Sequence, residues 1–143
     1  RDFDYDIPPV PIDVHRFRQV ISNLVNNALQ SLPEGMGKII VRSKLDNQNG
    51  VCVITLEDNG CGIKKTDLNQ IFEPFFSHKS KGTGLGLAIA KDAVNAHGGQ
   101  IIANNRKQGG ASFALSLPTL TFEAESHDQR GDDGTGAFCV LKE

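Results

Sequence analysis

The chain has 143 residues, enough for one compact domain with a core of ordinary size. Its formal net charge is −2 and it contains no run of Lys and Arg, which excludes a basic nucleic-acid-binding surface. There is no apolar stretch of about 18 residues and no signal-peptide pattern at the start, and three cysteines without C-x-x-C spacing suit a reducing compartment. We therefore expect a cytoplasmic, globular domain.

Hydrophobic periodicity and turn residues predict the elements in chain order. A short edge strand at 1–6 ends in prolines. The strongest helical pattern follows, capped by Asp13 and running from Val14 to Leu32 before Pro33 ends it. The remaining predicted elements are strands at 38–45 and 50–57, a glycine loop at 58–63, a short helix at 65–72, a helix at 85–97, and strands at 100–106 and 111–117.

This order of elements predicts the fold class and the domain boundary. Helices and strands in this arrangement form a two-layer α/β sandwich, with the helices on one face of a mixed, mostly antiparallel sheet. We assign residues 1–118 to this domain. Residues 119–143 are acidic and rich in Gly and Asp without periodicity, so we expect a tail or linker that is disordered in isolation.

The most informative segment is the glycine-rich run from Gly82 to Leu87, which leads directly into the predicted helix at 85–97. Glycines at a helix start let backbone N–H groups approach a ligand closely, and the positive end of the helix dipole favours a phosphate there. Many helices begin after a glycine turn. The basic stretch at 77–81 and two further motifs upstream strengthen the phosphate interpretation.

The first upstream motif is a row of uncharged amides on the long helix. Asn23 and Asn27 lie four residues apart and share a face with Gln19 and Gln30. A solvated helix face would have the same placement, but it usually carries Lys and Glu, and residues 20–32 contain no charge. Amide oxygens can bind a hydrated Mg²⁺ or lie beside phosphates. The spacing alone leaves both interpretations open.

The second upstream motif is Asp58 followed by Asn59 and Gly60, directly after a predicted strand. A carboxylate at a strand end can accept a hydrogen bond from the exocyclic amine of adenine, while the glycines let the base lie against the backbone. Asp-Asn-Gly is also a good hairpin turn, although the segment that follows predicts a helix and not a second strand.

A third motif joins aromatic and basic residues between 72 and 81. Clustered phenylalanines are usually core, and we assign Phe72 to the core. Phe75, in contrast, belongs to a Pro-Phe-Phe that precedes Lys79 and Lys81. An apolar anchor that leads into a basic, glycine-containing loop is typical of a lid over a nucleotide.

Together these segments resemble the ATP-binding catalytic domain of two-component sensor histidine kinases, which has the Bergerat fold. QVISNLVNNALQSL is similar to the N box of that family, DNGCGI to its G1 box, IFEPFF to its F box and GTGLGLAI to its G2 box. The resemblance covers about residues 2–118, and the nitrogen-regulation type of sensor kinase is the most similar.

The resemblance implies a function and its partners. The domain would bind Mg-ATP and donate the γ-phosphoryl group to a histidine on a separate dimerisation domain, with a response regulator as the indirect partner. It would be a monomer in isolation, with no contact to nucleic acid or membrane, although the parent protein can be membrane-anchored. Alternatives within the same fold are a serine kinase of the anti-sigma-factor type and a nucleotide-binding module without catalysis.

The resemblance also implies a role for each site residue. Asn27 would ligate Mg²⁺, Asp58 would accept the adenine amine, and Lys79 with the backbone of 82–87 would hold the phosphates. Gln30 stands where many relatives have lysine, and Ser112 stands where the family usually places a threonine. The implied nucleotide site comprises Asn23, Asn27, Gln30, Asp58, Gly60, Gly62, Ile63, Phe75, Lys79, Gly82, Thr83, Gly84, Leu85, Gly86, Leu87 and Ser112.

No catalytic residue is assigned within the chain. Relatives that hydrolyse ATP have a glutamate at the position of Asn23, and an amide cannot act as a general base, so we expect slow hydrolysis. None of the four histidines lies in the H-E-x-x-x-P or H-D-x-x-x-P setting of a phospho-acceptor. We therefore expect that this segment does not autophosphorylate alone.

Overall fold

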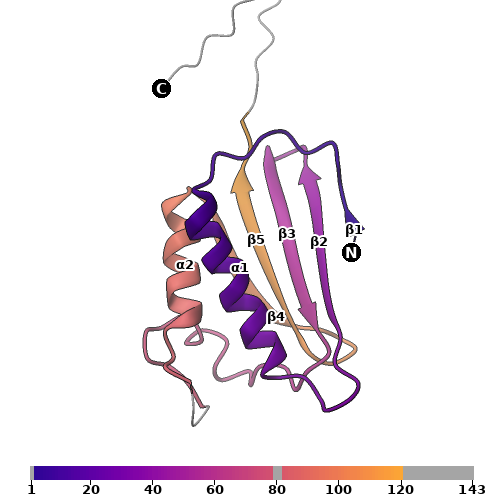
Figure 1. The fold of residues 1–143 in the computed structure, drawn as a ribbon, viewed down its shortest axis with the longest axis vertical. Helices are drawn as coiled ribbons and strands as arrows, with labels where there is room; N and C mark the ends of the chain where they lie inside the picture. Colours follow the sequence, from indigo (N-terminus) through magenta and orange to yellow (C-terminus); the bar gives the residue numbers. More distant parts are fainter. Residues whose placement is uncertain (1, 79–81, 121–143) are drawn as a thin grey trace, which may run out of the picture.

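The computed structural model describes residues 2–78 and 82–120. Both helices lie on one face of a five-stranded sheet with the order β1-β2-β3-β5-β4 (Figure 1). β1 pairs with β2 in parallel and the other neighbours are antiparallel, which confirms the mixed α/β sandwich. The elements are β1 (Asp2–Phe3), α1 (Val14–Leu29), β2 (Ile39–Asp46), β3 (Val51–Asp58), α2 (Gly86–Ala96), β4 (Gln100–Asn105) and β5 (Ala111–Pro118).

Helix α1 begins as predicted and ends earlier than predicted. Asp13 caps it, because its Oδ1 accepts hydrogen bonds from the N–H groups of His15 and Arg16 at 2.9 and 3.1 Å. The helix ends at Leu29 and not at Leu32, since Ser31 donates its N–H to the carbonyl of Ala28 and its hydroxyl to that of Asn27. These bonds tighten the last turn and let the chain leave the helix axis.

The predicted short helix at 65–72 is wrong. The segment consists of turns, in which Asp67 donates to the carbonyl of Lys64 and Gln70 to that of Asp67. Each of these bonds spans three residues. One bond spans four, from the N–H of Ile71 to the carbonyl of Asp67, but it does not continue into the i→i−4 ladder of an α-helix. Ile71 is the buried anchor of the segment, and the ring of Phe72 meets Phe113 edge-on, with centroids 6.5 Å apart.

The core fills the space between the helices and the sheet. Alternate residues of β5 are buried, as expected for a strand with one covered face. The largest fully buried apolar side chains of the core are Phe113, Leu24, Leu56, Leu115, Leu117, Val20 and Val94. Within residues 2–78 and 82–120, neither helix combines the length and apolar character needed to cross a bilayer.

His97 joins the end of α2 to the start of α1. Its Nε2 accepts the N–H of Asp13 at 2.8 Å, and its Nδ1 donates to the carbonyl of Ala93 at 2.6 Å. At the other end of the domain, Thr119 donates its N–H to the carbonyl of Gly50 and Leu120 donates to that of Pro9. The rest of the predicted tail, 121–143, lies outside the described residues.

Candidate nucleotide-binding site

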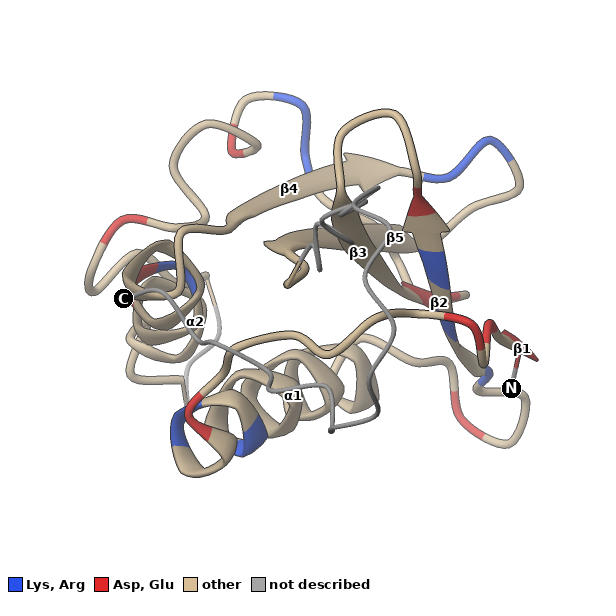
Figure 2. Ribbon diagram, turned by 90° about the horizontal axis from the view of Figure 1, so that it is seen from above, with Lys and Arg blue, Asp and Glu red and all other residues tan. Residues whose placement is uncertain are grey.

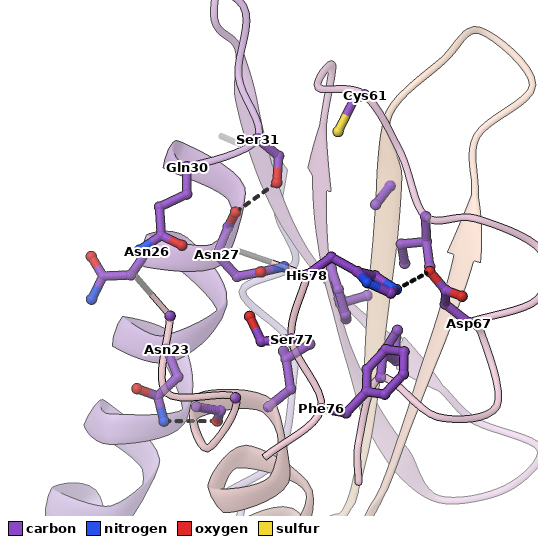
Figure 3. A pocket seen from close by; sticks show the side chains of 18 of the residues that line it. Asn23, Asn26, Asn27, Gln30, Ser31, Cys61, Asp67, Phe76, Ser77 and His78 are labelled. Carbon is purple, nitrogen blue, oxygen red and sulfur yellow. Dashed lines mark hydrogen bonds and ion pairs between the residues drawn. The ribbon is translucent and has the colours of Figure 1, made fainter. Parts of the chain in front are cut away.

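A cavity of about 620 Å³ opens between α1, the start of α2 and the loops that follow β3 (Figure 3). This volume is within the range of small-molecule sites, about 300–1,000 Å³. Its lining is Asn23, Asn26, Asn27, Gln30, Ser31, Asp58, Cys61, Gly62, Ile63, Lys64, Asp67, Ile71, Phe76, Ser77, His78, Gly82, Thr83, Gly84, Gly86, Leu87, Ala111 and Phe113.

Most of the residues predicted for the site meet in this cavity. Those brought together are Asn23, Asn27, Gln30, Asp58, Gly62, Ile63, Gly82, Thr83, Gly84, Gly86 and Leu87. Four predicted residues do not line it: Gly60, Phe75, Leu85 and Ser112. Lys79 lies outside the described residues.

The amides of α1 form one wall of the cavity. Helix α1 carries its charged residues only near its start (Figure 2), so this wall is polar and uncharged. Asn23 and Asn27 are half-buried, whereas Asn26 and Gln30 are exposed. Asn23 and Asn27 are thus partly shielded from solvent, and their role in binding stays a prediction. Asn26 was not predicted for the site, although its i,i+3 spacing from Asn23 places it next to the predicted row of amides.

The amide of Asn23 connects this wall to the glycine-rich segment. Its Nδ2 donates to the carbonyl of Gly86 at 2.9 Å, in the first residue of α2 (Figure 3). A Cβ on Gly86 would lie 3.7 Å from Cγ of Asn23, which is ordinary contact. Asn23 therefore holds the start of α2 against α1, in addition to lining the cavity.

Phe75 does not line the cavity, but its backbone contacts the glycine-rich segment. Its side chain is 77 % exposed, and its N–H donates to the carbonyl of Gly84 at 3.0 Å. A Cβ on Gly84 would come within 2.5 Å of the carbonyl carbon of Phe75, and the φ of Gly84 is +69°. Glycine is therefore required at 84. Phe76, and not Phe75, lines the cavity, together with Phe113 of β5.

Asp58 lies at the end of β3 and is 1 % exposed. Its Oδ1 accepts hydrogen bonds from the N–H groups of Gly60 at 2.8 Å and Ala111 at 3.1 Å. Among residues 2–78 and 82–120, both hydrogen bonds to this carboxylate end on Oδ1, so Oδ2 is left for a ligand in the cavity. A buried, ionisable acceptor of this kind selects a hydrogen-bond donor.

The loop after Asp58 does not form a hairpin. Cys61 donates its N–H to the carbonyl of Ser31, at the end of α1, at 3.2 Å. A Cβ on Gly60 would lie 2.4 Å from that same oxygen. Gly60 thus permits the loop to pack against α1. This packing explains why position 60 is a glycine, although Gly60 does not line the cavity. At the end of this loop, the N–H of Ile63 donates to Oδ1 of Asn105 at 2.7 Å, and Nδ2 of Asn105 donates to the carbonyl of Ile63 at 2.6 Å.

Ser112 lies on the opposite face of the sheet. Its neighbours Ala111 and Phe113 line the cavity, and successive side chains of a strand alternate between faces. Ser112 instead lines a shallow hollow beside Glu57 and Arg106. Ala111, which carries no hydroxyl, is the residue of β5 that touches Asp58. The position of Ser112 therefore does not support the threonine-like contact near adenine that the resemblance implied.

A histidine–carboxylate pair was missed by the sequence analysis. Nε2 of His78 lies 3.0 Å from Oδ2 of Asp67, whose side chain is 14 % exposed, and the ring of Phe76 meets His78 edge-on. No periodic spacing links positions 67 and 78, so only the tertiary structure reveals the pair (Figure 3). The other lining residues that were missed are Ser31, Lys64, Ile71, Ser77, Ala111 and Phe113.

The described residues contain no group of three His, Cys, Asp or Glu side chains that could hold a metal by themselves. Mg²⁺ does not require such a group, because it usually retains waters and binds one or two protein oxygens together with the phosphates of a substrate. The amide wall of α1, which faces the cavity, supplies neutral oxygen donors of this type.

Comparison with known proteins defines the class. Residues 12–121 match the family described as histidine kinase-, DNA gyrase B- and HSP90-like ATPases, and the chain belongs to this family. It is 39 % identical over 119 residues to the signal transduction histidine-protein kinase AtoS of Escherichia coli, covering 82 % of this chain and 19 % of AtoS. It is 35 % identical over 126 residues to the sensor histidine kinase WalK of Bacillus subtilis, covering 84 % of this chain and 20 % of WalK.

Solved structures narrow the class further. The catalytic domain of the histidine kinase ThkA, nucleotide-free, is 34 % identical with a TM-score of 0.70, over 82 % of this chain and 78 % of that one. Full-length ShkA in complex with AMPPNP is 27 % identical with a TM-score of 0.71, over 86 % of this chain and 26 % of ShkA. The chain is thus a catalytic, ATP-binding domain of the sensor histidine kinase type, and it spans about a fifth of the curated relatives described above. Its nitrogen-regulation subtype stays a prediction.

Proposed function

We propose that this domain binds Mg-ATP in the cavity and donates the γ-phosphoryl group to a histidine on a separate dimerisation domain, in two-component signalling. One observation carries the proposal: a buried carboxylate, Asp58, and the glycine-rich start of α2 line the same cavity. This combination supports an acceptor for a base amine and a site for phosphates within one cavity.

The adenine end is formed by Asp58 with apolar residues around it. Ile63, Ile71 and Phe113 line the same cavity as Asp58 and would cover the faces of a base. Oδ2 of Asp58 would accept the exocyclic amine, while Oδ1 stays bonded to two backbone N–H groups. A hydrogen bond to an ionised acceptor contributes about 1.5–3 kcal/mol, which is enough to select adenine over a base without that donor.

The phosphate end is formed by residues 82–87 and the amide wall of α1. Helix α2 has 11 residues, and its first N–H groups with the associated dipole favour anionic oxygens. Lys79 would add a positive charge. The amide oxygen of Asn27 would be a ligand of Mg²⁺, which when bound neutralises phosphate charge during transfer.

Phosphoryl transfer to a histidine is favoured over hydrolysis. The amide of Asn23 cannot remove a proton from water, and its Nδ2 is already bonded to Gly86. Among the described histidines, both ring nitrogens of His97 are hydrogen-bonded and His78 pairs with Asp67. His15 lies in the first turn of α1 and does not line the cavity, so none of the three is a suitable phospho-acceptor for a nucleotide bound there. The acceptor would therefore come from a partner domain, and the response regulator would receive the group afterwards.

Incubation with ATP labelled on the γ-phosphate tests this function. We expect no label on this chain alone and little phosphate release. When a separately produced dimerisation domain with its histidine is added, acid-labile label should appear on that domain, and Asp58→Asn should abolish the transfer. Acid-stable label on this chain would instead indicate a serine kinase, rapid phosphate release a hydrolase, and no reaction with any partner a binding module.

A further inference from the structure

A guanidinium group lies directly behind the adenine end of the site, on the face of the sheet away from the helices. Nη1 of Arg106 donates to the main-chain carbonyl of Asp58 at 2.7 Å. Nε of the same side chain lies 3.7 Å from Oε2 of Glu57. The side chains of Arg106 and Glu57 are 20 % and 21 % exposed, so this contact is largely shielded from water.

The carbonyl of Asp58 needs this donor because the sheet does not supply one. The paired register of β3 and β5 ends at Glu57 and Ser112, one pair short of Asp58. The next N–H of β5, that of Ala111, donates to the carboxylate Oδ1 of Asp58 at 3.1 Å instead of continuing the ladder. A buried carbonyl without a partner is costly. Arg106 replaces the missing ladder bond.

The β4–β5 loop brings Arg106 to this position. Arg106 donates its N–H to the carbonyl of Gly110 at 3.0 Å, which closes the loop. Gly110 has a φ of +86°, and a Cβ there would lie 2.0 Å from the carbonyl oxygen of Asp58. The close approach that Gly110 permits thus places the loop, and with it Arg106, against the backbone of Asp58.

We propose that Arg106 is a positioning residue for Asp58. By binding the carbonyl, it frees the N–H of Ala111 to orient the carboxylate, so that Oδ2 faces the amine of adenine. Arg106 would therefore determine the selectivity for the 6-amino group without touching the nucleotide. The inference rests on the proposed adenine contact of Asp58.

Arg42 is a matched control on the same face of the sheet. Its Nη1 lies 2.6 Å from the same oxygen, Oε2 of Glu57, that Arg106 approaches. The pairing with Glu57 raises the pKa of the Arg42 guanidinium, first through the hydrogen bond and then through the charge. Within the described part of the chain, its ion-pair partners are Glu57 and Asp2, and Asp58 is not among them. Removing Arg42 therefore perturbs the charge network of Glu57 without removing the contact with Asp58.

The test compares two nucleotides, ATP and purine riboside triphosphate, which lacks the 6-amino group. Their dissociation constants are measured by calorimetry, with Mg²⁺, for the wild-type chain and for Arg106→Ala, Arg106→Lys and Arg42→Ala. The wild type should prefer ATP about tenfold or more, as one charge-assisted hydrogen bond implies. The ratio of the two dissociation constants, that of purine riboside triphosphate over that of ATP, should fall towards one in Arg106→Ala, mainly through weaker ATP binding. Arg42→Ala should keep the wild-type ratio.

Arg106→Lys keeps the test valid if Arg106→Ala does not fold. Lysine retains the charge beside Glu57, but its single nitrogen cannot reproduce the two contacts of the guanidinium, so the ratio should again fall. An unchanged ratio in the folded Arg106 variants, with both nucleotides weakened equally or not at all, would overturn the positioning role alone. Absence of a preference for ATP in the wild type would overturn the adenine contact of Asp58, and this inference with it.

Discussion

The substitution Asp58→Asn tests the adenine site most directly. The amide that replaces the carboxylate can keep its oxygen at the place of Oδ1, as the acceptor for the N–H groups of Gly60 and Ala111, and its NH₂ group then faces the cavity where Oδ2 was. Both that NH₂ group and the adenine amine are hydrogen-bond donors, so no hydrogen bond can form between them. Asp58→Ala is a poorer test, because it leaves two N–H groups without a partner, at about 1–3 kcal/mol each, and can unfold the domain.

The magnitude follows from the contacts that are lost. The charge-assisted bond to the amine is worth about 1.5–3 kcal/mol, and each 1.4 kcal/mol is tenfold in affinity, so ATP binding should weaken by about ten- to a hundredfold or more. The free energy of unfolding should change by only about 1 kcal/mol, since both backbone bonds at the Oδ1 position persist as neutral ones.

Titration calorimetry with Mg-ATP measures the affinity, and thermal melting without nucleotide measures the stability. Asp46→Asn is the matched control, because the Oδ1 of Asp46 also accepts two backbone N–H groups, those of Gln48 and Asn49, but in the β2–β3 turn away from the cavity. It should bind ATP like the wild type. An ATP affinity of Asp58→Asn equal to that of the wild type would refute the role of Asp58.

The other predictions concern the metal, the loop, the cysteines and the helix cap. Asn27→Ala should bind nucleotide with little difference between Mg²⁺ and EDTA; an undiminished Mg²⁺ enhancement in calorimetry would exclude Asn27 as a ligand. Asn105→Ala should accelerate hydrogen exchange at the amide of Ile63, which donates to Asn105, and leave the amide of Ile101 unchanged. Iodoacetamide at neutral pH should label the exposed Cys61 before Cys52, because burial raises the pKa of the Cys52 thiol; peptide mass spectrometry would show the reverse order if this is wrong. The pKa of Asp13 is lowered from 3.8, first by the N–H of Arg16, so its stabilisation of α1 is present above 3.8 and is lost as the pH falls through the lower folded-state value. The melting temperature of the wild type should consequently fall further than that of Asp13→Ala between neutral pH and pH values below 3.8; parallel curves would argue against the cap.

Local sequence determined the elements whose signals depend on near neighbours. The helix predicted at 14–32, the cap at Asp13 and the turn at 46–49 are set by contacts within a few residues, and the structure confirms all three, with the helix ending at Leu29. The glycines at 82–86 likewise predicted a helix start, and α2 begins at Gly86, whereas ligand binding there stays a prediction. The segment 65–72 was predicted wrongly because its apolar residues support one buried anchor and no continuous backbone ladder.

The tertiary structure alone decided which predicted residues face the cavity. Strand alternation turned Ser112 away and placed Ala111 beside Asp58, and this depends on the register of β3 against β5. The pair of Asp67 and His78 and the contact from Arg106 to Asp58 join positions 11 and 48 residues apart. Spacing rules describe one helix or one strand at a time, so side chains that meet across elements become predictable only when the sheet order and register are known.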